Sequence, residues 1–150
     1  MIHGHVHIKG AFNIQKLVDL VKKSEGFEKA GALAIFIGVV RGETSAGEKV
    51  QGLEIEAYEE KANEMLSRIC SDLKKREGIV DVQIHHFVGD FNVGEDLVYV
   101  VVAGSHRENV FPVLAEAVER YKKEAPLFKK ELTVGENGQV RGVWVAEKES

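Results

Sequence analysis

Hydrophobic residues recur along this chain with two different periodicities. A period of two, typical of strands, alternates with the wider spacing of a helix that buries one face. Helical spacing covers residues 14–21, about 59–76 and about 105–124. Alternating or continuous apolar runs cover residues 2–8, 31–40, 53–60, 80–89, 96–104 and 131–147. The pattern predicts an α+β protein with about three helices and a mixed, mostly antiparallel sheet, closed by a C-terminal hairpin.

The run at residues 31–40 is continuously apolar apart from its glycines, and it predicts a strand buried on both faces. Arg41 follows directly, at the point where a rigid strand meets the loop 42–49. That loop contains glycine, serine and threonine but lacks the GxxxxGK[ST] spacing of a phosphate-binding P-loop. We therefore expect a flap and no nucleotide cradle.

The N-terminal strand alternates between two kinds of side chain. Its apolar residues at positions 2, 6 and 8 are predicted on one face, and its histidines at positions 3, 5 and 7 on the other. Histidine is a common metal ligand, but no carboxylate or cysteine stands nearby in the sequence. A polar outer face is the preferred interpretation, and no metal site is predicted.

The helix predicted after residue 104 has mixed signals at its start. Ser105 and Glu108 form a capping-box pattern, whereas Pro112 would cost about 3 kcal/mol inside a helix unless the regular helix begins near Asn109. Pro126 is expected to end it near residue 124. The predicted buried stripe consists of Phe111, Leu114, Ala115, Val118 and Tyr121.

Length and composition limit the class of protein. The chain has 150 residues, of which 44% are hydrophobic, so we expect one domain covering residues 1–150. A net charge of -4 argues against general nucleic-acid binding. The longest apolar run, residues 32–40, is too short to cross a membrane, and the N-terminus has no apolar block typical of a secretory signal. We expect a cytoplasmic protein without membrane association.

Cys70 is the single cysteine of the chain, which excludes an intrachain disulfide and a thiolate metal cluster. It lies on the apolar stripe of the helix predicted at 59–76, where a buried structural thiol is expected. Sulfur chemistry at this protein would therefore need sulfur brought by another molecule.

Positive charge gathers around one predicted helix of this acidic chain. His106 and Arg107 stand near its start, Lys122 near its end, and Lys129 beyond Pro126. Helix N-termini and clustered cations both favour anions. The pattern predicts that these groups converge on an anion site, although a solvated charged segment at 122–131 would give the same composition.

At these residues the chain resembles a known family, the large, catalytic subunit of molybdopterin synthase. The resemblance includes FIGVVR from Phe36, SHRENVF from Ser105, KKEAPLFKKE from Lys122 and the closing WVAEKES. It implies an α/β-hammerhead-like fold and conversion of cyclic pyranopterin monophosphate (precursor Z) into molybdopterin. It also implies a sulfur donor, a small ubiquitin-like subunit with a C-terminal Gly-Gly thiocarboxylate, and a central homodimer within a heterotetramer. No bound cofactor is implied.

The resemblance also assigns substrate-binding residues. Arg41 and His106 would hold the substrate phosphate or its pterin, and Arg107 would assist with a guanidinium suited to oxyanions. Val39 and Val40 lead into Arg41 and would give backbone contacts to the ligand. For Arg107, an ordinary surface arginine near a helix start is the alternative.

Lys122 and Lys129 match the lysine pair that the family places beside the incoming tail. One would orient the thiocarboxylate and stabilise the oxyanion, while the other would donate or accept a proton, and both roles favour lysines whose pKa is lowered by neighbouring cations. Lys130 and Glu131 complete the matched segment and are expected to line the pocket.

Two other classes of function fit the same features. A non-catalytic adaptor would bind the small ubiquitin-like protein without transferring sulfur, and an unrelated protein would simply bind a small anion. Replacing Lys122 or Lys129 separates an enzyme from an adaptor, because only the enzyme loses product formation while partner binding persists.

Overall fold

The computed structural model describes residues 3–145 of the chain, and its elements confirm the predicted α+β class. Seven strands form one sheet in the order β2-β5-β4-β3-β6-β7, and β1 pairs with β4 beside this path. The strands are β1 (Gly4–Ile8), β2 (Ala32–Val39), β3 (Val50–Ala57), β4 (Ile79–Asn92), β5 (Asp96–Gly104), β6 (Leu127–Val134) and β7 (Val140–Val145). The helices are α1 (Ile14–Lys22), α2 (Glu59–Lys74), α3 (Arg107–Glu124) and the short 3₁₀ helix η1 (Phe27–Lys29).

The long strand β4 joins two halves of the molecule. One edge of β4 pairs with β1 in parallel at Ile84–Val88, and the same edge then pairs with β3 in antiparallel at Gly89–Asn92. Gly89, at the change of partner, has a φ of 130°, a backbone conformation that favours glycine. The remaining pairs are antiparallel, so the sheet is mixed and mostly antiparallel as predicted.

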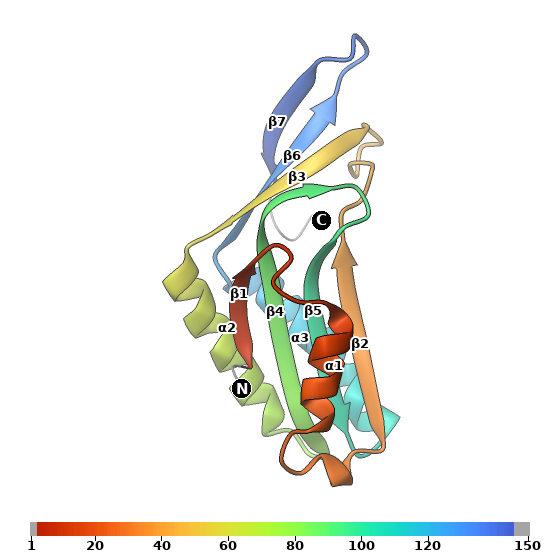
Figure 1. Cartoon of the computed structure of the whole chain (residues 1–150), viewed down its shortest axis with the longest axis vertical. Coiled ribbons are helices and arrows are strands. Elements are labelled where there is room, and N and C mark those ends of the chain that lie inside the picture. Colours follow the sequence, from red (N-terminus) through yellow and green to blue (C-terminus); the bar gives the residue numbers. More distant parts are fainter. Residues whose placement is uncertain (1–2, 146–150) are drawn as a thin grey trace.

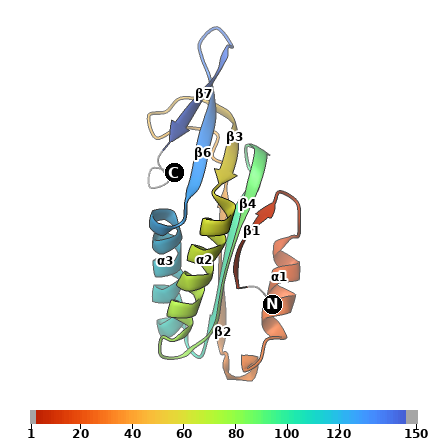
Figure 2. The same cartoon turned by 90° about the vertical axis from the view of Figure 1, so that its left-hand side faces the viewer.

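Helices cover the two faces of the sheet unequally. α2 and α3 lie side by side on one face, and α1 lies on the other (Figure 2). The β3, β6 and β7 strands extend beyond this layered half (Figure 1). β5 is buried from Leu97 to Gly104 because it lies inside the sheet with helices on both sides. A functional cavity can therefore form where the layered half meets the extension.

Several local predictions are confirmed. The Asn13 side chain accepts a hydrogen bond from the Lys16 N–H at the start of α1. Cys70 is buried on the inner face of α2, and burial raises the pKa of its thiol to about 12. It is therefore an unreactive core residue. The C-terminal hairpin forms from β6 and β7, with β6 beginning at Leu127, earlier in the chain than predicted.

The prediction that residues 31–40 are buried on both faces is wrong. β2 is an edge strand, and Ile35, Ile37 and Val39 are 40%, 37% and 52% exposed. A continuous apolar run does not reveal whether a second layer covers both faces. Ile8 likewise departs from its predicted core position, because it ends β1 and is 78% exposed.

The predicted capping box is also absent. The N-cap of α3 is His106, whose side chain makes no capping hydrogen bond, and the helix already begins at Arg107. The hydroxyl of Ser105 donates to Asn109 Oδ1 over 3.3 Å. Pro112 lies inside the helix, where the Glu108 carbonyl loses its usual N–H donor.

The buried stripe of α3 is shifted from the predicted one: the two share Tyr121, and Leu114 and Val118 are partly buried against the core. Phe111 is 60% exposed, and the buried side chains are Val110, Val113, Ala117 and Tyr121. Apolar residues occur on more than one face of this helix, so two stripes fit the helical spacing. Packing against β5 and β2 selects the one that contains Val110.

The N-terminal histidines contribute to a chain of hydrogen bonds beneath α1. His7 Nε2 lies 2.8 Å from His85 Nδ1, and His85 Nε2 lies 2.7 Å from Gln83 Oε1. The Gln83 amide in turn donates to the buried Asp81 carboxylate over 3.1 Å. Because Gln83 Oε1 can only accept, His85 carries a proton on Nε2. Burial, which lowers the pKa of His85 to about 3, keeps the ring neutral.

Within residues 3–145, no three histidine, cysteine or acidic side chains are grouped so that they could hold a metal.

No helix in the described part of the chain has the length and apolar character needed to span a membrane.

The buried histidines make the fold sensitive to acid. Desolvation lowers the pKa of both His85 and His86 from 6.5 to about 3. Between these values the unfolded chain binds protons that the folded chain does not, so stability falls with falling pH by about 1.4 kcal/mol per pH unit for each histidine. Urea unfolding between about pH 6 and 4.5 should show this slope, and His85→Gln should reduce it by about half. Equal slopes for the variant and the wild type would contradict the assignment.

Candidate functional site

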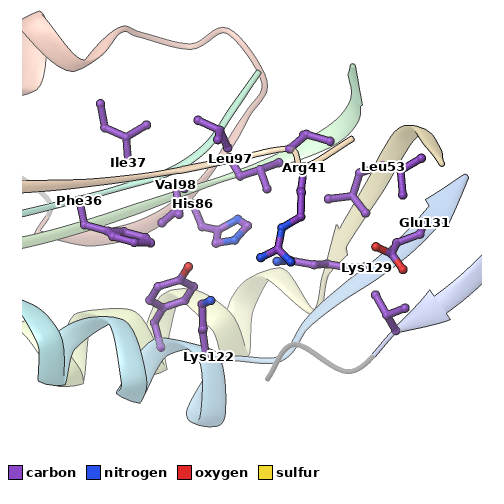
Figure 3. Close-up of a pocket in the computed structure, with 16 residues that line it drawn as sticks. Phe36, Ile37, Arg41, Leu53, His86, Leu97, Val98, Lys122, Lys129 and Glu131 are labelled. Atoms are coloured by element: carbon purple, nitrogen blue, oxygen red, sulfur yellow. The ribbon is translucent and has the colours of Figure 1, made fainter. Parts of the chain in front are cut away.

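A cavity of about 420 Å³ lies where the two halves of the sheet meet. Figure 3 shows side chains from β2, β4, β5, α3 and β6 directed toward it. Its lining residues are Phe36, Ile37, Gly38, Val39, Val40, Arg41, Val50, Leu53, His86, Leu97, Val98, Tyr121, Lys122, Lys129, Glu131 and Val145. The wall is mostly apolar, with a small group of ionisable side chains.

Three cations from three separate segments share this cavity. Arg41 follows the end of β2, Lys122 lies in the last turn of α3, and Lys129 lies on β6. Glu131 is the one acid among the described lining residues, so the lining carries a formal charge of about +2 in a chain of -4. Lys129 is only 5% exposed, which places one of these charges inside the protein.

The local sequence explains how the lysine pair is brought together. α3 ends at Glu124, and Leu127 already begins β6, so the Ala125–Pro126 link turns the chain within two residues. The last turn of α3 favours a cation at Lys122 through the helix dipole. Alternation along β6 then directs Lys129 and Glu131 to the same side of the strand.

Lys130 does not line the cavity. Its side chain lies on the other face of β6, with Nζ 5.7 Å from the Trp144 ring centroid and 3.9 Å from Glu54 Oε2. The expectation that Lys130 lines the pocket is therefore wrong for the cavity seen here. Val39, Val40, Arg41 and Glu131, by contrast, are all in the lining.

His106 and Arg107 also lie away from the cavity. They stand at the start of α3, whereas Lys122 stands at its end, so about 22 Å of helix separates the two groups. Arg107 is exposed, and its Nε lies 3.5 Å from Glu108 Oε1. The prediction that all the cations converge holds only for Arg41, Lys122 and Lys129 within one chain, because side chains at opposite ends of one helix cannot meet.

The structure adds His86, which sequence reasoning did not assign to the site. Its Nδ1 donates to the Phe87 carbonyl over 2.9 Å, and its ring packs against Tyr121 at 5.7 Å between centroids. Burial, together with the positive charges of Lys129 and Lys122 and against the opposing effect of the Phe87 carbonyl, lowers the pKa of His86 to about 3. The imidazole is thus a neutral group inside a cationic site.

Sequence alternation did indicate that His85 and His86 point to opposite faces, and the structure confirms this. His85 joins the hydrogen-bonded chain under α1, while His86 faces α3 and the cavity. The sequence did not reveal which histidine faces the cavity, because both faces of β4 are covered by helices.

The arrangement suits an anionic ligand with an apolar portion. The buried Lys129 interacts strongly with an anion because little water screens it, and the half-buried Lys122 and exposed Arg41 add to the attraction. A lysine next to a reacting carbonyl also stabilises the oxyanion formed during acyl transfer. Phe36, Leu97 and Val98 supply apolar surface around these charges.

Comparisons with known proteins identify the family. A sequence model of the family described as MoaE protein matches residues 8–124, a range that includes Arg41 and Lys122 and ends before Lys129. The molybdopterin synthase catalytic subunit of Pyrococcus abyssi is 39% identical over 122 residues, which are 81% of this chain and 79% of that protein.

Solved structures share the fold. A crystal structure of molybdopterin synthase from Staphylococcus aureus has a TM-score of 0.80 and 25% identity, covering 97% of this chain and 98% of that one. A chain from the complex of subunits 1 and 2 of molybdopterin-converting factor from Helicobacter pylori has a TM-score of 0.70 and 23% identity, covering 92% and 89%.

The cationic cavity should bind simple anions in the absence of any partner. Phosphate at about ten times its Kd should stabilise the folded chain by about 1.4 kcal/mol, measured as a rise in Tm of a few degrees. Lys129→Met should lose most of this rise. Lys130→Met, on the opposite face of the same strand, is the matched control and should keep it. Equal losses in both variants would show that the anion binds outside the cavity.

Proposed function

The chain belongs to the MoaE protein family of molybdopterin synthase catalytic subunits, which act in molybdenum cofactor biosynthesis, and we propose the reaction that its cavity performs. The enzyme converts cyclic pyranopterin monophosphate into molybdopterin. Sulfur comes from the C-terminal thiocarboxylate of a small ubiquitin-like subunit. The observation that carries this proposal is the meeting of Arg41, Lys122 and Lys129 in one cavity.

Both reactants are anions, which is why the cationic cavity supports the proposal. The substrate carries a phosphate and the tail ends in a thiocarboxylate, so two negative groups must approach each other during sulfur transfer. Repulsion between them is reduced when lysine and arginine side chains lie between them. Arg41, with its planar guanidinium, suits the phosphate, and the lysine pair suits the tail.

The lysine pair fits the acyl-transfer part of the reaction. When the thiocarboxylate sulfur forms a bond to a substrate carbon, a carbon–oxygen bond at that carbon breaks, and the oxygen leaves with the electron pair and takes up a proton. The tail is then joined to the substrate as a thioester. Water then attacks the acyl carbon, the acyl carbon–sulfur bond breaks, and the tail leaves as a carboxylate. Lys129 or Lys122 stabilises the oxyanion of this step, while the other lysine transfers a proton.

The partner enters as an extended C-terminal tail. The Helicobacter pylori complex joins subunits 1 and 2 of molybdopterin-converting factor, and this chain shares the fold of one component. We propose an equivalent complex here, with the tail held by backbone hydrogen bonds as it passes toward the lysines.

His106 and Arg107 reach the cavity from a second copy of the chain. The family resemblance assigns them to the substrate, yet about 22 Å of helix separates them from Lys122 in one chain. In a homodimer, the α3 start of one protomer supplies these side chains to the cavity of the other. The assembly proposed is therefore a central homodimer that carries one small subunit per protomer.

Loss of either cavity lysine should stop turnover without dissociating the partner. Lys122→Ala and Lys129→Ala should each reduce molybdopterin formation by about 100-fold or more, because an oxyanion-stabilising charge is removed. Lys123→Ala is the control, since Lys123 is exposed and pairs with Glu119 at 3.4 Å. Molybdopterin formation is measured with cyclic pyranopterin monophosphate and the thiocarboxylated partner. Binding of the partner is measured by gel filtration. Full turnover by both alanine variants would overturn the catalytic assignment of Lys122 and Lys129.

The second-copy assignment is testable by mixing inactive variants. His106→Ala and Lys129→Ala proteins should each have low activity alone. After denaturation and joint refolding, mixed dimers with one intact site should restore about one quarter of wild-type activity. No recovery on mixing, with dimers verified by light scattering, would contradict the sharing of His106 between protomers.

A further inference from the structure

One atom in the cavity lacks the partner that its burial requires. His86 is fully buried, and its Nε2 has no hydrogen-bond partner among the described residues. An unsatisfied buried polar atom costs free energy, so such an atom in a native fold calls for an explanation. Its place in the wall of the ligand cavity provides one, because a bound ligand would supply the missing partner.

The other ring nitrogen determines what that partner must be. Nδ1 lies 2.9 Å from the Phe87 carbonyl oxygen, which only accepts, so Nδ1 carries the proton. In the neutral ring Nε2 is then a lone-pair acceptor. The ligand must therefore present a hydrogen-bond donor at this point, although the neighbouring Lys122 and Lys129 select for an anion.

Few ligand groups combine an anion with an adjacent donor. A phosphate dianion offers only acceptor oxygens, and a thiocarboxylate likewise offers only acceptors. In the last residue of a peptide, however, the amide nitrogen is two bonds from the carboxyl carbon, at about 2.5 Å. A C-terminal group held by the two lysines thus brings its own N–H within a few ångströms of the same wall.

We propose that His86 Nε2 accepts a hydrogen bond from the peptide N–H of the last residue of the sulfur-carrier tail. This assignment rests on the proposed function, and it adds a tail-binding residue to the lysine pair. His86 fixes the rotation of the terminal residue about its backbone and so determines which face of the thiocarboxylate meets the substrate. Figure 3 shows His86 between β4 and α3, directed toward the region of Lys122 and Lys129.

The test removes the donor and the acceptor in turn. Two peptides are titrated calorimetrically into the full-length chain: one ends in Gly-Gly carboxylate, and the other replaces the last amide N–H with an ester oxygen. The wild type should prefer the amide by about 5- to 10-fold, the value of one buried hydrogen bond. His86→Leu should bind both peptides within about twofold, and His86→Gln, which restores an acceptor, should recover the preference.

The outcomes separate this inference from the proposed function. In one outcome, the wild type binds the peptides without preferring the amide, and Lys129→Ala loses this binding. That outcome overturns the His86 assignment alone. A preference that survives in folded His86→Leu also overturns it. If the wild type binds neither peptide, both the tail-binding function and the role of His86 fail. The wild-type comparison of the two peptides needs no variant, so poor folding of His86→Leu does not prevent the test.

Discussion

The structure depends on one strand that pairs with both halves of the sheet. β4 pairs with β1 along part of its edge and with β3 along the rest, and the change falls at Gly89. Below this point two layers of helices bury the strand, and above it β3, β6 and β7 extend outward (Figure 1). The cavity occupies the junction, where the helical layer ends and the extension begins.

That junction allows a cationic site inside an acidic protein. Arg41, Lys122 and Lys129 come from segments far apart in sequence, and their mutual repulsion opposes folding. Glu131 and the negative end of the α3 dipole offset part of this repulsion. An anionic ligand offsets more of it, so the same charges that destabilise the free protein favour binding.

His85 and His86 lie on opposite faces of β4, and both are neutral although charged groups lie nearby. His85 is held neutral by burial and by the neighbouring histidines of β1, and His86 is held neutral by burial beside two lysines. A protonated ring at position 86 would add a further positive charge and lose its acceptor. Remaining neutral, it lets the cavity combine cationic attraction with directional hydrogen bonding.

The sequence by itself determined the element types, the buried thiol of Cys70 and the separation of His85 from His86, because these follow from local periodicity. It also singled out Arg41, Lys122 and Lys129 through a family resemblance. It could not place the stripe of α3 or the exposed face of β2, since apolar spacing allows more than one packing.

Only the tertiary structure decided which predicted site residues meet. His106 and Lys122 both belong to the cationic group around α3, yet they stand at its opposite ends, and Lys130 turns away from Lys129 on the same strand. Convergence is a property of helix length, strand alternation and the β4 junction together. The role of His86 also emerged at this level, because an unpaired nitrogen is visible only when its surroundings are known.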